Sequence, residues 1–195
     1  MDPDDEQTLI DRRRSAFRIG FEGDRESAVR LFQEVIPDLT RVLGPDHRQT
    51  LTARHQLSVN IGSGGNPLEA VRLLREVHPE MVRVLGPDHA QTLKAAGHLA
   101  RYLGESGDRA GAVELHHRVV ADLTRVEGAE HPRTLVARRY LAVDVGLGGD
   151  EAEAARLLRE LIPQLAEVLG ADHGQTASAR HDLEHFSCMT SSRIV

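Results

Sequence analysis

The sequence repeats itself at a fixed step of 42 residues. The segment LGPDHRQT at 43–50 returns as LGPDHAQT at 85–92, EGAEHPRT at 127–134 and LGADHGQT at 169–176. Columns of identical residues keep this step, among them Gly44, Gly86, Gly128 and Gly170; His47, His89, His131 and His173; Thr50, Thr92, Thr134 and Thr176; and Ala28, Ala70, Ala112 and Ala154. A fixed period of this length predicts a linear array of stacked units that bury their apolar faces against one another.

Each unit carries the signals of two helices, as residues 45–85 illustrate. Asp46 is a candidate N-cap for the first helix, and Gln49 three residues later is its capping-box partner. Gly62 is expected to end this helix, because glycine tolerates the left-handed conformation at a helix C-terminus. The unit is therefore expected to begin with one helix that ends at Gly62.

The second helix of the unit has an equally clear start. Asn66 is expected to cap it, Pro67 to occupy its first position, and Glu69 to close the capping box. Apolar residues then follow at helical spacing, and Gly86 ends the helix. The pattern predicts an all-α fold, an α-solenoid of stacked antiparallel helix hairpins.

The repeated Gly-Pro-Asp-His segment is interpreted as the joint between hairpins. The glycine ends one helix, the proline prevents its continuation, and the aspartate starts the next helix. The histidine is expected to close the joint by hydrogen bonding or packing. Asp5 replaces this histidine at the first joint, and a catalytic site has no reason to recur at every joint of a solenoid.

Composition narrows the class of protein. Hydrophobic residues make up 40% of the chain but aromatic residues only 3%, so the core must be aliphatic, which favours helices over a β-sandwich. The net charge of −6 argues against nucleic-acid binding. Cys188 is the single cysteine, which excludes an internal disulfide and fits a reducing compartment. The polar, acidic start and the lack of a long apolar run predict a cytoplasmic protein without a membrane span.

The repeats resemble the tetratricopeptide repeat. The marks are Gly-Asp pairs at the hairpin turns (Gly23-Asp24, Gly107-Asp108, Gly149-Asp150, with Gly65-Asn66), each followed by the alanine column. The period is similar to that of the longer subtype in kinesin light chains and bacterial regulatory proteins. The resemblance covers residues 1–186 and implies a single right-handed superhelix, with units at about 1–42, 43–84, 85–126 and 127–168, a half unit at 169–186 and a tail at 187–195.

The family resemblance also implies a binding groove lined by the first helices. Ten basic or polar residues on them are the candidate peptide-binding set: Arg13, Arg14, His55, Gln56, Lys94, His98, Arg101, Arg139, Tyr140 and His181. Phe17, Asp182 and His185 belong to the same rows. A cationic groove can hold an acidic peptide through charge-assisted hydrogen bonds, so we expect a noncatalytic module that binds a partner protein or acidic peptide. The alternative is that these side chains form a solvated or self-contacting face, or a groove for another kind of ligand.

Other functions remain open at this point. The array could regulate a larger bacterial signalling protein, or it could self-associate through its terminal half unit as a scaffold. An enzyme is disfavoured, and no cofactor or metal is expected. GSGGN at 62–66 lacks the Lys-Ser/Thr of a phosphate loop. His181 and His185 are four residues apart but no third ligand is apparent. Asp144 is interpreted as a solvated carboxylate rather than a groove residue.

Overall fold

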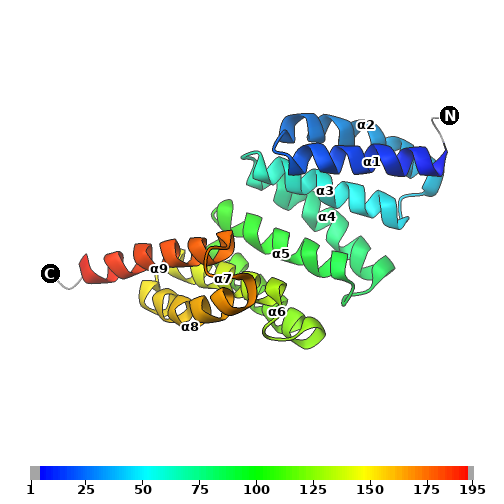
Figure 1. Cartoon of the computed structure of the whole chain (residues 1–195). Helices are drawn as coiled ribbons and strands as arrows, with labels where there is room; N and C mark the ends of the chain where they lie inside the picture. Colours follow the sequence, from blue (N-terminus) through cyan, green and yellow to red (C-terminus); the bar gives the residue numbers. More distant parts are fainter. Residues whose placement is uncertain (1–4, 193–195) are drawn as a thin grey trace. The chain divides into compact units, whose positions relative to one another are not determined.

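The computed structural model describes residues 5–192 of the chain. This part contains nine α-helices and no strand (Figure 1). Their bounds are α1 Glu6–Phe21, α2 Arg25–Leu43, α3 Arg48–Ser63, α4 Pro67–Leu85, α5 Ala90–Glu105, α6 Arg109–Glu127, α7 Pro132–Leu147, α8 Glu151–Leu169 and α9 Gly174–Ser192. From α1 to α8, first helices of 16 residues alternate with second helices of 19 residues, and α9, the last first helix, has 19 residues.

The chain forms two compact units, Met1–Tyr102 and Leu103–Val195, whose boundary falls inside α5. In the first unit α1 packs on α2, α2 on α3 and α3 on α4, and α1 also contacts α3. In the second unit α6 packs on α7, α7 on α8 and α8 on α9, and α7 contacts α9. The predicted all-α solenoid of helix hairpins is therefore confirmed. The single array and its unit boundaries stay a prediction.

Each unit contains a cluster of buried core residues that is aliphatic except for one phenylalanine. The core of the first unit contains Leu9, Ala16, Ala28, Phe32, Val35, Leu39 and Ala53. That of the second contains Leu135, Ala142, Ala154, Ala155, Leu158, Leu161, Leu165, Ala179 and Phe186. Within residues 5–192, no helix is both long and apolar enough to cross a membrane.

The joints are capped by histidine, not by aspartate as predicted. The backbone N–H of Gln49 donates to Nδ1 of His47 at 3.3 Å, and the same bond forms at His89, His131 and His173 over 3.2, 3.2 and 3.1 Å. Asp46 instead pairs with Arg83. Gly44 has a φ of 95°, and the turn after it places the histidine, one residue later than expected, at the helix start. The expectation that the histidine closes the joint by hydrogen bonding is confirmed.

The threonine column completes three of the joints, whereas Thr92 donates to the carbonyl of Met81 at 3.4 Å. The hydroxyl of Thr50 donates to the carbonyl of Gly44 at 2.8 Å, and Thr134 and Thr176 make the same bond to Gly128 and Gly170 at 2.8 and 2.9 Å. Each bond satisfies a carbonyl that the end of the preceding helix leaves without an intrahelical partner. At the joints before α3, α7 and α9, two side chains of the repeat, the histidine and the threonine, therefore hold the turn.

The prediction that Gly62 ends α3 is wrong. The helix continues to Ser63, and Gly65, with a φ of 100°, makes the turn. Gly62 is instead a packing residue, because a Cβ atom there would lie 2.8 Å from the Cβ of Ala70 and would overlap the ring of Tyr102. The second helix begins as predicted, since Asn66 accepts from the backbone N–H of Glu69 at 3.2 Å.

Two further expectations need correction. Glu69 does not close the capping box, because its carboxylate accepts hydrogen bonds from Arg72 at 2.6 and 2.8 Å. The first helix of the fifth unit was expected to end near residue 186, but α9 continues to Ser192. Part of the predicted tail is therefore helical, because no glycine or proline interrupts residues 187–192.

Replacing Ala112 with arginine should disrupt the stack. Ala112 is fully buried in α6, so Ala112→Arg places an uncompensated charge in a close helix contact. We expect the free energy of unfolding to fall by about 3 kcal/mol or more. Chemical denaturation followed by circular dichroism measures this loss. Ala121→Arg on the exposed side of the same helix is the control, and equal losses in both variants would contradict the assigned buried face.

The histidine caps make a second prediction. His47→Ala removes the acceptor at the start of α3 and should cost about 1 kcal/mol of stability. His47→Asp should retain most of it, because Asp5 caps α1 in the same way by accepting from the backbone N–H of Thr8. Urea unfolding of the three proteins measures the difference. A larger loss in Asp46→Ala than in His47→Ala would show that aspartate is the cap.

Candidate interaction surface

The ten predicted residues all lie on first helices, as periodicity indicated. Arg13 and Arg14 are on α1, His55 and Gln56 on α3, Lys94, His98 and Arg101 on α5, Arg139 and Tyr140 on α7, and His181 on α9. The first seven belong to the first compact unit and the last three to the second. One continuous groove lined by all ten residues stays a prediction, and each unit is described by itself below.

A row of side-chain contacts links each first helix to the next within a unit. Nη1 of Arg13 donates to Oε1 of Gln56 at 2.8 Å, Nε2 of His55 lies 2.9 Å from Nδ1 of His98, and Nε of Arg139 donates to Oδ2 of Asp182 at 2.8 Å. The members of each pair are 43 residues apart, one more than the repeat. The first residue of each pair therefore contacts not its equivalent in the next first helix but the residue that follows that equivalent. Several of the predicted groove residues bind one another in this way.

The His55–His98 pair is the most strongly perturbed group of the first unit. His55 is 4% exposed, and the ring centroids of the pair are 5.1 Å apart. Burial lowers the pKa of His55 to about 4, with smaller contributions from Lys94 and His78. Burial also lowers the pKa of His98 to about 3, and His55, Arg101 and Lys94 add to the effect. Both rings are therefore neutral at pH 7, and one donates a hydrogen bond to the other.

Two cationic side chains, Lys94 and Arg101, lie near this neutral pair. Lys94 is exposed on α5. The guanidinium of Arg101 lies 4.4 Å from the ring centroid of Tyr102 and donates to Oγ of Ser63 at 3.2 Å. A guanidinium held over an aromatic ring keeps its charge and is restrained in position. The first unit thus presents Lys94 and Arg101 beside two histidines that carry no charge at pH 7.

The α1 helix adds an exposed aromatic pair. Phe17 is 47% exposed and Phe21 83% exposed, and their ring centroids are 6.3 Å apart. Phe17 belongs to the rows implied by the family resemblance, but Phe21 was missed. Its signal in the sequence is an aromatic residue four positions after Phe17, on the same helix face. Arg14 lies nearby in sequence and pairs with Asp11 at 3.2 Å, so its charge is partly balanced.

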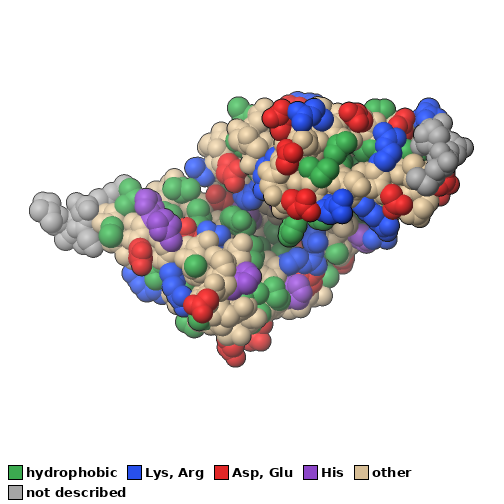
Figure 2. Space-filling view, turned by 45° about the horizontal axis from the view of Figure 1, so that its top comes forward, with side chains coloured by type: hydrophobic (Ala, Val, Ile, Leu, Met, Phe, Trp, Pro, Cys, Tyr) green, Lys and Arg blue, Asp and Glu red, His purple; other side chains and the backbone are tan. Residues whose placement is uncertain are grey.

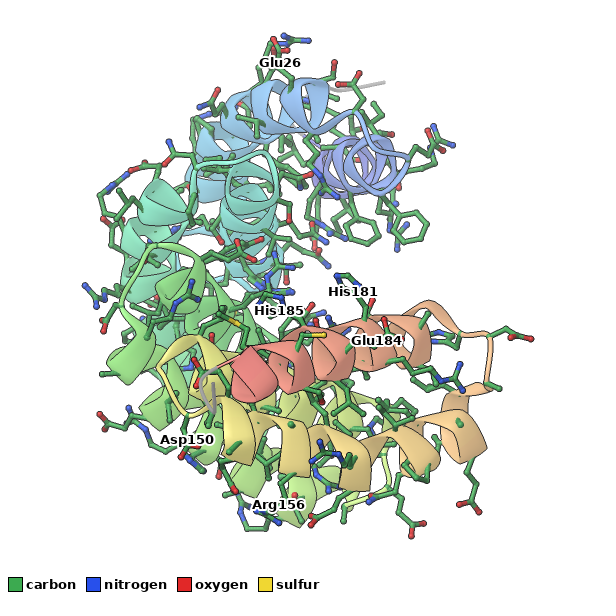
Figure 3. All side chains as sticks on the ribbon, turned by 90° about the vertical axis from the view of Figure 1, so that its left-hand side faces the viewer. Glu26, Asp150, Arg156, His181, Glu184 and His185 are labelled. Atoms are coloured by element: carbon green, nitrogen blue, oxygen red, sulfur yellow. The ribbon has the colours of Figure 1, made fainter. Side chains whose placement is uncertain are left out.

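In the second unit the predicted cation is already neutralised. The side chain of Arg139 is 13% exposed and pairs with Asp182, and its Nη1 also donates to Gln175 at 3.1 Å. The guanidinium lies 5.4 Å from the ring centroid of Tyr140. His181 is exposed on α9 (Figure 3). An acidic ligand would have to displace Asp182 to reach Arg139.

The interpretation of Asp144 as a solvated carboxylate is wrong. Asp144 is 5% exposed, its Oδ2 lies 2.7 Å from Nδ1 of the fully buried His116, and Arg109 is 3.7 Å from its other oxygen. The ring of His116 stacks on Tyr140 with centroids 6.0 Å apart. Asp144 faces Gly104, one repeat earlier, which leaves room for a carboxylate because it has no side chain. The sequence does carry a signal for this contact. Each glycine of the column that includes Gly104 is followed 40 residues later by a residue whose type varies between repeats, here Asp144.

Charges of both signs are interspersed over the surface. Figure 2 shows acidic and basic side chains lying near one another across the face in view. On α4, for example, Arg72 binds Glu69 at 2.6 Å and Glu76 at 2.6 Å, and on α8 Arg156 binds Glu153 and Glu160 in the same way. Exposed pairs of this kind contribute little to stability, but they leave few cations available to a ligand. Residues 5–192 contain no group of three or more side chains placed to bind a metal ion.

Comparisons with known proteins agree with this geometry. A family model described as tetratricopeptide repeat matches residues 22–49, 50–91 and 92–133, more than half of the chain. The chain therefore belongs to the tetratricopeptide repeat family. Such repeats form protein-interaction modules, and the fold is in general a noncatalytic scaffold. No curated protein sequence matches the chain.

Solved structures show similar repeats. Two crystal structures of nearly identical TPR-like repeats, from a protein assigned as a kinesin light chain of Podosopora anserina, are 27% and 28% identical to this chain, with TM-scores of 0.78 and 0.76. The matches cover 99% and 95% of this chain and 90% and 88% of those chains. BtubC (BKLC) from P. vanneervenii is 14% identical over 91% of this chain and 78% of its own, with a TM-score of 0.63, and shares the fold.

The buried histidine pair should make stability depend on pH. The pKa values of about 4 and 3 in the folded chain lie below the value of about 6.5 expected for unfolded histidine, so the unfolded chain binds more protons between these limits. This contribution to stability is complete above about pH 6.5 and is lost as pH falls below it. We expect the wild type to lose about 1–3 kcal/mol more between pH 7 and pH 5 than His55→Gln/His98→Gln.

Urea unfolding at the two pH values measures that difference. His117→Gln is the control, because His117 is exposed on α6 and belongs to the other unit. All other ionisable groups are common to the proteins and cancel in the comparison. An equal loss of stability in the wild type and the double variant would show that the pair is not held neutral by burial.

Proposed function

We propose that the chain is a protein-binding module that holds an acidic segment of a partner on the first helices of residues 5–102. The observation that carries the proposal is the cationic set on α5. Lys94 and Arg101 lie beside the uncharged His55–His98 pair, and Arg101 is restrained by Tyr102. Family membership supports binding of a protein partner, and the sign of the side chains supports an acidic one.

The proposal differs between the two units. The sequence predicts that Arg139 and Arg101 both bind the acidic partner. Arg139 instead pairs with Asp182 and thereby links two helices of the second unit. In the first unit, Lys94 makes no ion pair or hydrogen bond with the described residues. Binding therefore centres on Lys94 and Arg101, with the exposed ring of Phe17 as an apolar contact.

Self-association through the last half unit has less support. Glu184 is exposed on α9 at the column that holds buried Ala16, Ala100 and Ala142 in earlier repeats. A carboxylate there opposes apolar packing against a second copy. A role within a larger signalling protein would use the same binding surface. It therefore predicts the same binding residues as the proposed function.

Peptide selection tests the proposed function. A random peptide library displayed on phage is selected against the full chain, and synthetic copies of the enriched peptides are titrated by fluorescence anisotropy. We expect enrichment of Asp and Glu, and about tenfold or weaker binding to Lys94→Glu/Arg101→Glu, because charge-assisted bonds are replaced by repulsion. Binding should also weaken as salt rises.

Arg30→Glu/Arg75→Glu is the matched control. It makes the same change of net charge in the same unit, but on exposed positions of the second helices α2 and α4. Circular dichroism should show equal helicity in both double variants. Enriched peptides without an acidic bias, or equal affinity for both double variants, would overturn the proposal.

A further inference from the structure

The α9 helix carries four side chains of metal-ligating type on one exposed stripe. Because α9 continues to Ser192, residues 181, 184, 185 and 188 stand at positions i, i+3, i+4 and i+7 of a single helix, which share one face. The residues are His181, Glu184, His185 and Cys188, and all four are exposed. The irregular tail expected after residue 186 would not have placed Cys188 beside the histidines.

The ring nitrogens of these two histidines have no hydrogen-bond or ion-pair partner in the described structure. Arg13, His55 and Arg139 occupy the column of His181 in other repeats, and each bonds to the following first helix. No hydrogen bond or ion pair involves the ring nitrogens of His181 or His185 among residues 5–192. Figure 3 shows both histidines projecting from the side of α9 that faces away from α8.

Packing restrains one of these rings. The ring of His185 meets that of Phe186 edge-on, with centroids 5.1 Å apart. Phe186 is 2% exposed and fills the space beside Gly146, where a Cβ atom would lie 2.5 Å from its ring. The helix and its anchoring residue are therefore held in place, which lowers the entropy lost when the neighbouring imidazole binds a ligand.

We propose that His181 and His185 chelate one divalent transition-metal ion, of the Zn²⁺, Ni²⁺ or Cu²⁺ class, on the exposed face of α9. Side chains four residues apart on a helix have Cβ atoms about 5–6 Å apart, and imidazole nitrogens bind such ions at about 2.0–2.1 Å, so both rings can reach one ion. Imidazole is a poor ligand for Ca²⁺ and Mg²⁺, which take oxygen donors. The two nitrogen donors therefore favour these transition-metal ions over Ca²⁺ and Mg²⁺.

The site is open on the side away from the helix. No three described side chains are placed to bind one ion, so the protein supplies two ligands. The remaining coordination positions take water or donor atoms of another molecule, as at catalytic and bridging sites rather than closed structural ones. Protons compete with the metal for imidazole nitrogen, so affinity decreases as the pH becomes acidic.

Isothermal titration of the full chain with NiCl₂ and with ZnCl₂ tests the site. We expect one ion per chain at pH 7.5, and a metal-dependent rise of the melting temperature. His181→Ala and His185→Ala should each weaken binding about tenfold or more, because the second imidazole no longer acts at high effective concentration. His117→Ala is the control, since His117 is exposed on α6 and has no histidine four residues away.

The variants also separate this site from its alternatives. Both histidines are exposed, so the variants should fold, which circular dichroism verifies. Cys188→Ser should leave Ni²⁺ affinity within about twofold of the wild type. Unchanged affinity in His181→Ala and His185→Ala, or loss of binding in Cys188→Ser alone, would overturn the two-histidine site. None of these results depends on whether the first unit binds an acidic peptide.

Discussion

The close approach of helices at a glycine inside α1, α3, α5 and α7 sets the geometry of the repeats. Gly62 touches Ala70 of its own hairpin and Tyr102 of the next first helix, and Gly146 does the same with Ala154 and Phe186. Any Cβ atom at the glycine would push two neighbours away at once. At Gly62 and Gly146 the missing side chain is replaced by a ring from the next first helix, and at Gly104 by the carboxylate of Asp144, so the register cannot slip there without a clash or a void.

Sequence reasoning was accurate where a signal is local. Asn66 and Pro67 mark a helix start by chemistry that operates within one turn, and the structure has that start at the expected residue. Gly62 was misread because glycine is favoured both at helix ends and at close contacts, and only the neighbouring helix distinguishes the two. The choice between Asp46 and His47 as cap failed for a related reason, since the path of the turn after Gly44 decides which residue meets the free N–H groups.

For the candidate site too, the sequence predicted local features but not contacts between helices. Periodicity was enough to place the ten residues on the first helices. It could not reveal that Arg139 binds Asp182 or that His55 binds His98, because those contacts join residues 43 apart and depend on how far one helix is displaced along its neighbour. The sequence thus identifies the rows of a surface, whereas the offset between helices determines which members of a row remain available.

This offset couples stability to binding. A cation that bonds to the next first helix, such as Arg139, helps hold two repeats together and gives up its charge to an internal carboxylate. The His55–His98 pair also joins two repeats, but it does so without charge, and therefore places no carboxylate beside Lys94 and Arg101. In the proposed function, a neutral link between helices beside the exposed Lys94 and the half-buried Arg101 lets one face serve both as a helix interface and as a surface for an anionic partner.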